Sequence, residues 1–166
     1  MWEFTCPVCK TDETVLPFGP KTSPVLIIGD HPGKDELRDG KPFVGATGGV
    51  LRSELSRVKL DSNRMRMTNL WMHEPNENDE CMDVGAKAVL KESQGKKVIL
   101  LVGSATVKYF ANVSVEGYNG LVVACPYFPH AVAVACVQPT TVFHGTLGEF
   151  RFAMQQFAVV IRKELG

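Results

Sequence analysis

Short apolar runs alternate with amphipathic stretches along this chain. A strand buried on both faces is predicted at residues 25–28, a short apolar and β-branched run. The clearest strand pattern in the chain predicts another strand at residues 96–103. Two further strands are predicted at residues 64–69 and 140–144. Apolar side chains at helical spacing predict helices over residues 47–57, 83–93 and 104–110, and from about 145 to 164.

Two further apolar segments can be connected in either of two ways. Residues 121–125 and 131–137 can form a hairpin or one strand with an insertion, and a turn is expected at residues 117–120. Strands that alternate with helices favour parallel pairing through crossover connections. We therefore predict one domain over residues 1–166, an α/β fold with a three-layer α/β/α sandwich around a small, mainly parallel sheet. Residues 1–24 are expected to be an irregular lead-in.

Polar side chains follow three of the predicted strands. Asp30 and His31 follow the first, Asn69 ends the second and His144 ends the last. The carboxyl ends of strands in an open parallel sheet meet at one cleft, where ligands bind. The pattern therefore predicts that an acid, an amide and imidazoles converge on one site.

Composition and charge limit the partners and the cellular location that we expect for the protein. The 166 residues carry a formal net charge of zero, so a nucleic-acid surface would need local clustering of basic groups. Candidates for such contacts are Lys34, Lys41, Arg64, Arg66 and Arg151. The sequence has no apolar run of membrane-spanning length and no secretory signal pattern at its start. We expect a cytoplasmic monomer, nucleoid-associated in a cell, with no membrane partner.

Five cysteines in a reducing compartment are thiols or metal ligands. Cys6 and Cys9 form a C-x-x-C pair, which places two thiolates close enough to bind one metal centre, as in zinc knuckles and iron–sulfur sites. A thioredoxin-like redox pair is disfavoured, because no strand precedes the pair and no helix follows it. Cys125 and Cys136 are expected to be buried thiols.

The loop after the first strand carries a family resemblance. It contains Gly29-Asp30-His31-Pro32-Gly33, then Glu36, then Gly40-Lys41-Pro42-Phe43-Val44-Gly45. This pattern resembles the first motif of the uracil-DNA glycosylase superfamily, and it is most similar to the iron–sulfur family 4 enzymes. Asp30 replaces the family's Glu. The second predicted strand also ends in Thr68-Asn69, as in the family.

The resemblance implies a DNA glycosylase of base excision repair that flips uracil, or a related modified pyrimidine, out of DNA and excises it. It implies that Asp30 positions or activates water, that His144 donates to the leaving base, and that no cofactor takes part in the chemical step. Phe43 would stack on the flipped base and Asn69 would bind its Watson–Crick edge. His31 would contact DNA phosphate or water.

The resemblance also implies a structural metal centre. Cys6, Cys9, His73 and Cys81 occupy its four ligand positions, with His73 where the family has Cys. The family favours a [4Fe–4S] cluster, and the Cys₃His composition would also suit zinc.

The last motif departs furthest from the family. The chain has His144-Gly145-Thr146 in place of His-Pro-Ser. Thr146 keeps a hydroxyl for a phosphate contact, Leu147 is expected to wedge into the base stack, and Arg151 is expected to contact the DNA backbone. These departures leave a second hypothesis, a catalytically altered or inactive relative that binds DNA carrying damaged or modified bases.

Overall fold

A five-stranded sheet forms the centre of the molecule. The computed structural model describes residues 4–139, 145 and 147–166. The strand order is β2-β1-β3-β5-β4. Four strands pair in parallel: β1 (Val25–Gly29), β2 (Arg66–Asn69), β3 (Val98–Val102) and β5 (Val132–Cys136). β4 (Val122–Val123) pairs antiparallel with β5, so residues 121–137 contribute two strands and not one. The strand predicted at residues 140–144 lies outside the described residues.

Helices connect the strands largely where the sequence predicts them. The helices are α1 (Lys34–Asp39), α2 (Ala46–Arg57), α3 (Asp79–Glu92), α4 (Ser104–Ala111), α5 (Val115–Tyr118) and α6 (Leu147–Leu165), with a 3₁₀ turn at Ser62–Arg64. The sequence pattern missed α1 and α5, and α5 covers the first half of the turn predicted at residues 117–120. Within the described residues, we find no helix with the length and apolar character that crossing a bilayer requires.

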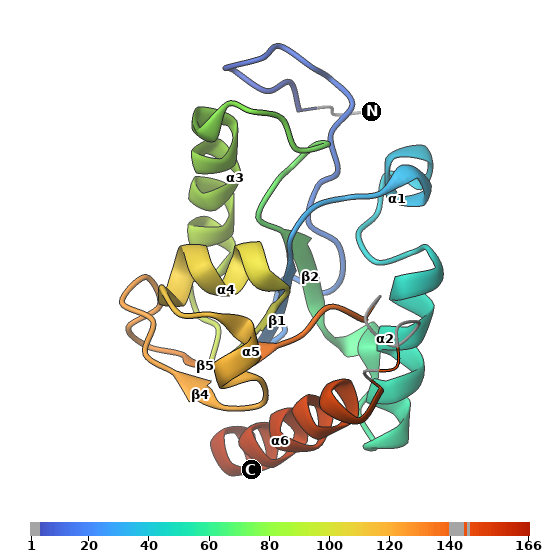
Figure 1. Cartoon of the computed structure of the whole chain (residues 1–166), viewed down its shortest axis with the longest axis vertical. Helices are drawn as coiled ribbons and strands as arrows, with labels where there is room; N and C mark the ends of the chain where they lie inside the picture. Colours follow the sequence, from blue (N-terminus) through green and yellow to red (C-terminus); the bar gives the residue numbers. More distant parts are fainter. Residues whose placement is uncertain (1–3, 140–144, 146) are drawn as a thin grey trace.

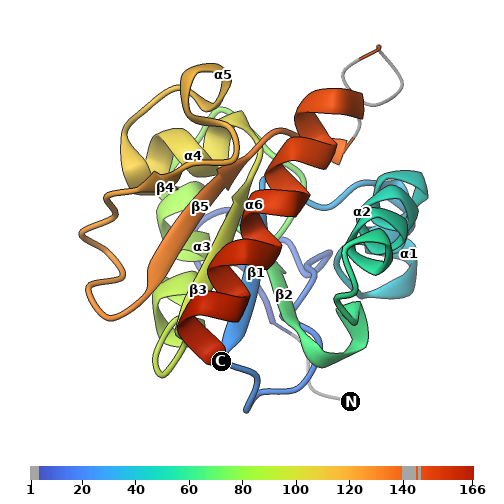
Figure 2. The same ribbon diagram turned by 90° about the horizontal axis from the view of Figure 1, so that it is seen from below.

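The sheet is covered on both faces, as a three-layer α/β/α sandwich requires. Figure 2 shows α6 lying across one face of the sheet beside α2, with α3 and α4 on the other face. Successive side chains of a strand point to opposite faces. Val25 and Ile27 accordingly pack in the core under α2 and α6, and Leu26 and Ile28 in the core under α3 and α4. These two cores confirm the predicted architecture.

The N-terminal segment runs along the edge of the sheet next to β2. Residues 4–24 are irregular apart from turns and one bridge between Phe18 and Met67, as predicted. The backbone N–H of Val15 donates to the carbonyl of Met72 at 2.7 Å, which fixes the segment beside the chain that leaves β2. In Figure 1 the segment reaches the loop that leads into α3. It therefore brings Cys6 and Cys9 close to His73 and Cys81.

Arg66 corrects one expectation from the sequence. Its guanidinium is buried, donates to the Glu92 carboxylate at 2.8 and 3.0 Å, and donates to the carbonyl of Gly19 at 2.6 Å. Hydrogen bonding to Arg66 lowers the pKa of Glu92. The assignment of Arg66 as a DNA-backbone contact is therefore wrong, because the side chain joins β2 to α3 inside the protein.

Candidate active site and metal centre

A cavity of about 420 Å³ opens at the carboxyl ends of β1 and β2. Its lining comprises Gly29, Asp30, His31, Gly33, Glu36, Phe43, Thr47, Asn69 and Gln138. Gly29 and Asn69 both line the cavity because they are paired directly at the ends of β1 and β2. The predicted convergence of strand ends is therefore observed for Asp30, His31 and Asn69. His144, the fourth member, lies outside the described residues.

Asp30 lies in the wall of the cavity against the start of α4. One carboxylate oxygen accepts from the backbone N–H of Thr106 at 2.8 Å and from its hydroxyl at 2.6 Å. The other accepts from the Gln138 amide at 2.9 Å and lies 3.4 Å from the N–H of Ala105. A negative charge at a helix N-terminus is favourable. Gly103, which precedes α4, must lack a side chain, since a Cβ there would lie 2.5 Å from Asp30 Oδ2.

Phe43 presents its ring to the cavity from a constrained loop. Its backbone is left-handed, with φ +56°, which is uncommon for a residue other than glycine and is found disproportionately at functional sites. Its carbonyl accepts a hydrogen bond from Arg52 and packs against Gly48 of α2, where a Cβ would clash with it. Its ring rests against Gly29, where a Cβ would lie 2.7 Å from Cζ. The ring therefore has a fixed position.

Asn69 contributes an amide beside that ring. A Cβ on Gly29 would lie 2.6 Å from Asn69 Oδ1, so the glycine leaves room for both the amide and the Phe43 ring. The side chain is largely buried and lines the cavity. Within the described part of the chain, the amide makes no hydrogen bond, and its donor and acceptor are available to a ligand.

Glu36 and Gln138 belong to the site, although the sequence analysis gave them no role. The buried carboxylate of Glu36 accepts from the backbone N–H groups of Gly33 at 2.9 Å, Val44 at 2.9 Å and Gly45 at 2.7 Å, and so closes the loop that carries Phe43. Gln138 follows β5 as Asn69 ends β2. Gln138 directly follows the apolar segment 131–137, so its position after a strand could have been predicted if that segment had been assigned as a parallel strand.

The other predicted contacts lie around this cavity or beyond the described residues. His31 is exposed, with its Nδ1 3.1 Å from the carbonyl of Pro32. Leu147 begins α6 and is partly exposed. Arg151 donates to the buried carboxylate of Glu54 at 2.8 Å, which ties α6 to α2. Of the basic residues predicted to contact DNA, Lys34, Lys41 and Arg64 are exposed. Thr146 lies outside the described residues.

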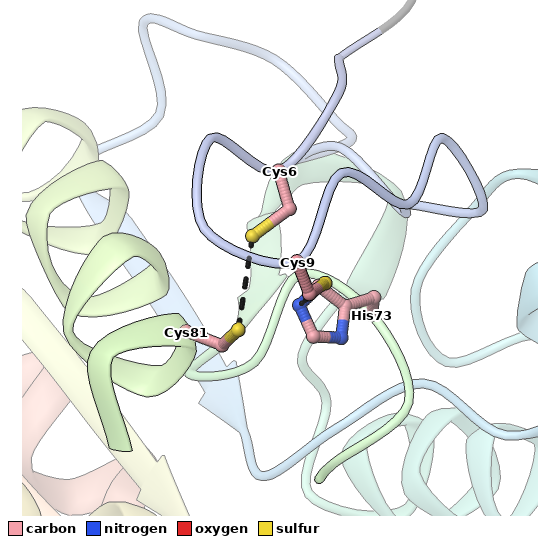
Figure 3. Close-up of side chains that lie close together, drawn as sticks. All are labelled: Cys6, Cys9, His73 and Cys81. Atoms are coloured by element: carbon pink, nitrogen blue, oxygen red, sulfur yellow. Dashed lines mark hydrogen bonds between the residues drawn. The ribbon is translucent and has the colours of Figure 1, made fainter. Parts of the chain in front are cut away.

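Four metal-binding side chains converge at the other end of the N-terminal segment. Figure 3 shows Cys6, Cys9, His73 and Cys81 pointing toward one another. Their ligand atoms all lie within 4.8 Å of one another, with Cys6 Sγ 3.9 Å from Cys81 Sγ and Cys9 Sγ 3.5 Å from His73 Nε2. The chain therefore has a Cys₃His group that could bind a metal, in the combination that the sequence predicts.

The surroundings of these thiols favour ionisation of Cys6. Burial raises the pKa of Cys6, but hydrogen bonds from the backbone of Cys9 and Val8 outweigh it and bring the pKa down to about 6. For Cys81, the Asn76 amide lowers the pKa, yet burial and the neighbouring Cys6 raise it overall. By contrast, Cys136 is buried as expected, whereas Cys125 is only partly buried and its thiol donates to the carbonyl of Phe110.

Comparison with known proteins assigns the chain to a family. Residues 16–159 match the family model of the uracil DNA glycosylase superfamily. The chain belongs to this superfamily. The matched region includes the whole cavity lining and two of the four metal-binding residues, His73 and Cys81.

Curated relatives from archaea place this superfamily member near one branch. The chain is similar to type-4 uracil-DNA glycosylases of Archaeoglobus fulgidus (26% identical over 117 residues, 65% of this chain and 58% of the relative) and Pyrobaculum aerophilum (35% over 74 residues, 44% and 38%). The enzyme of the same name from Sulfurisphaera tokodaii is 25% identical over 104 residues, 58% of this chain and 47% of the relative. Each match spans less than two thirds of the relative's length. The resemblance to family 4 is thereby confirmed.

Proposed function

We propose that this protein is a DNA glycosylase that binds a flipped uracil, or a related modified pyrimidine, and cleaves its N-glycosidic bond. One observation carries the proposal: in a superfamily member, the fixed ring of Phe43 lines one cavity together with the Asn69 amide, which has no hydrogen-bond partner among the described residues. The cavity volume of about 420 Å³ lies in the range of small-ligand sites, roughly 300–1,000 Å³. DNA is the proposed partner, since a base reaches such a cavity only after leaving the helix stack.

The two side chains divide the recognition of the base. A base stacked on the Phe43 ring gains about 1–3 kcal/mol without regard to its identity. The Asn69 amide can donate to O4 and accept from N3–H of uracil, which cytosine cannot satisfy because it carries an amino group in place of O4. Specificity would then depend on Asn69, and affinity on Phe43.

The catalytic groups are assigned on the resemblance. His144 is proposed to donate to O2 as negative charge develops on the leaving base, a contribution of about 3–4 kcal/mol for one such donor. Thr146 and Arg151 are proposed to hold DNA phosphate, and Leu147 to fill the gap left in the stack. His31, at the exposed rim of the cavity, is proposed to contact phosphate or water.

Asp30 is proposed to hold water near C1′, but its surroundings favour a second candidate function. Both carboxylate oxygens already accept hydrogen bonds from the protein, from Thr106 and from Gln138. A carboxylate whose oxygens already accept hydrogen bonds from the protein has fewer lone pairs left to hold a water molecule. A relative that binds modified bases in DNA without excising them is therefore the alternative.

The Cys₃His group is proposed to be a structural metal centre that takes no part in the chemical step. Binding a metal supplies a cross-link between the N-terminal segment and the residues that follow β2. Cys6 and Cys9 would hold it from one side, and His73 and Cys81 from the other.

A glycosylase assay tests the proposal. Metal-loaded protein is incubated at low salt with single-stranded oligonucleotides that carry one uracil, thymine or cytosine, and abasic sites are detected by alkaline cleavage. We expect cleavage at uracil alone. Asn69→Ala and His144→Ala should each lower the single-turnover rate about 100-fold, because each removes an interaction that strengthens in the transition state.

The same experiment separates the two candidate functions. Wild-type protein that binds uracil-containing DNA but releases no base would refute the glycosylase and favour the binding relative. Protein that neither binds nor cleaves DNA would refute both.

A further inference from the structure

Two of the distances among the four metal-binding atoms are close to those expected around a single tetrahedral ion, and none of the distances exceeds 4.8 Å. With a zinc–sulfur distance of about 2.3 Å and a zinc–nitrogen distance of about 2.0–2.1 Å, ligand atoms around one zinc lie about 3.5–3.8 Å apart. Here Cys6 Sγ and Cys81 Sγ are 3.9 Å apart, and Cys9 Sγ and His73 Nε2 are 3.5 Å apart. We infer that this site binds one zinc ion, and not the [4Fe–4S] cluster that the resemblance to family 4 implies.

A four-iron cluster does not fit this spacing. Each protein ligand of such a cluster binds a different iron, so four irons and four sulfides lie between the ligand atoms. Two ligand atoms are then separated by an iron–iron edge and by two bonds that point outward from it. All four atoms here lie within 4.8 Å of one another, which leaves room for one ion among them.

Neighbouring groups support the same assignment by orienting the ligands. His73 Nδ1 lies 2.8 Å from the carbonyl of Glu74, so Nδ1 carries the proton and Nε2 presents its lone pair to the centre. The Asn76 amide donates to Cys81 Sγ at 3.5 Å. The C-x-x-C loop folds back on itself, with the N–H of Lys10 donating to the carbonyl of Cys6 at 2.9 Å and with a left-handed Lys10, at φ +66°. Three thiolates and one imidazole form a common structural zinc set.

The inference rests on the metal centre proposed above and is independent of glycosylase activity. The test is metal and sulfide analysis of full-length protein purified anaerobically from cells grown with both iron and zinc, with a visible spectrum of the same sample. We expect about one zinc per chain, no acid-labile sulfide and no broad visible absorption. Replacing zinc with cobalt(II) should give the intense d–d bands of tetrahedral thiolate coordination.

Each other outcome overturns the inference in a distinct way. About four irons and four sulfides per chain, as purified or after incubation with iron and sulfide, would establish the cluster instead. One iron without sulfide would leave a single-ion site but exclude zinc, and less than a tenth of an equivalent of any metal would refute the centre itself. Cys125→Ser, which changes a thiol outside the site, should bind as much zinc as the wild type.

Discussion

At the scale of single residues, the candidate active site depends on positions where a side chain is missing. Gly29 lies beneath both the Phe43 ring and the Asn69 amide, and Gly48 lies against the Phe43 carbonyl. Gly103 leaves the space that the Asp30 carboxylate occupies. These glycines let polar groups and a ring approach the sheet edge more closely than any other residue would allow.

Gly29→Ala should therefore disable the cavity while leaving the fold in place. The new methyl would lie 2.6 Å from Asn69 Oδ1 and 2.7 Å from Phe43 Cζ, so one of the two side chains must move. We expect uracil release, or binding of uracil-containing DNA, to fall about tenfold or more, and the free energy of unfolding to fall by about 1–3 kcal/mol. The measurements are activity per folded molecule and unfolding followed by circular dichroism.

Gly49→Ala is the matched control for that substitution. Gly49 lies in α2 with nothing within 4 Å of its would-be Cβ, so alanine should raise the free energy of unfolding by about 0.5–1 kcal/mol without changing activity. If Gly29→Ala, like Gly49→Ala, left activity unchanged, the positions of the Phe43 ring and the Asn69 amide would not matter for binding or cleavage.

At the scale of elements, partly buried ion pairs join helices to the sheet and to each other. Arg66 of β2 holds Glu92 of α3, and Arg151 of α6 holds Glu54 of α2. Both pairs link segments distant in sequence, and in both at least one partner is largely buried. Such a pair is most informative when one charge is removed, because the partner is then left buried and uncompensated.

Glu92→Gln should lower stability at neutral pH and change its dependence on acid. The pKa of Glu92 lies below its ordinary value of 4.5, so the pair stabilises the fold above that value and the stabilisation disappears as the pH falls through the lowered pKa. At pH 7 we expect the variant to lose about 1–3 kcal/mol in urea unfolding. The two proteins should converge once the pH has fallen below the lowered pKa of Glu92.

The exposed Glu164, near the end of α6, provides a control for the change of charge. Glu164→Gln should unfold at the wild-type urea concentration at both pH values. A Glu92→Gln difference that stayed constant from pH 7 to pH 3 would contradict the proposed ion-pair origin of the effect.

At the scale of the whole molecule, the Cys₃His group brings the N-terminal segment against the rest of the domain, and the metal proposed to bind there would cross-link the two. Cys6 and Cys9 approach His73 and Cys81 across more than sixty residues of sequence, as the 3.5 Å contact between Cys9 and His73 illustrates with a separation of 64. Residues 4–24 have little regular structure of their own. We therefore expect their order to depend on metal binding at this group and on contacts such as that of Val15 with Met72.

Cys9→Ser should loosen the segment without unfolding the sheet. Removal of one ligand weakens metal binding and with it the cross-link. We expect trypsin to cleave after Lys10 and Lys21 about tenfold faster than in the wild type, as followed by mass spectrometry, with the remaining domain intact. Cys125→Ser should be cleaved at the wild-type rate, and equal cleavage of all three proteins would argue against a cross-linking role.

The sequence by itself determined the architecture. Apolar runs such as 25–28 and the helical spacing of residues 47–57 express burial, a local property of each side chain, and they led to the three layers. The sequence also predicted the Cys₃His group. The resemblance to family 4 supplied this prediction, because hydrophobic periodicity does not show which distant residues lie together. By contrast, α1 was missed, because its six residues are mostly charged and its ends are set by the Glu36 carboxylate and by Gly40 at φ +71°.

Only the tertiary structure decided which group each polar side chain meets. Arg66 looked available to DNA until the fold placed Glu92 against it, and Asp30 proved to be held by Thr106 and Gln138, which lie 76 and 108 residues away. The spacing that favours one ion over a cluster likewise depends on how three segments approach one another: the Cys6–Cys9 loop, the residues after β2 and the start of α3. Burial can be inferred residue by residue, whereas hydrogen bonds and metal coordination require partners that the chain brings together only when it has folded.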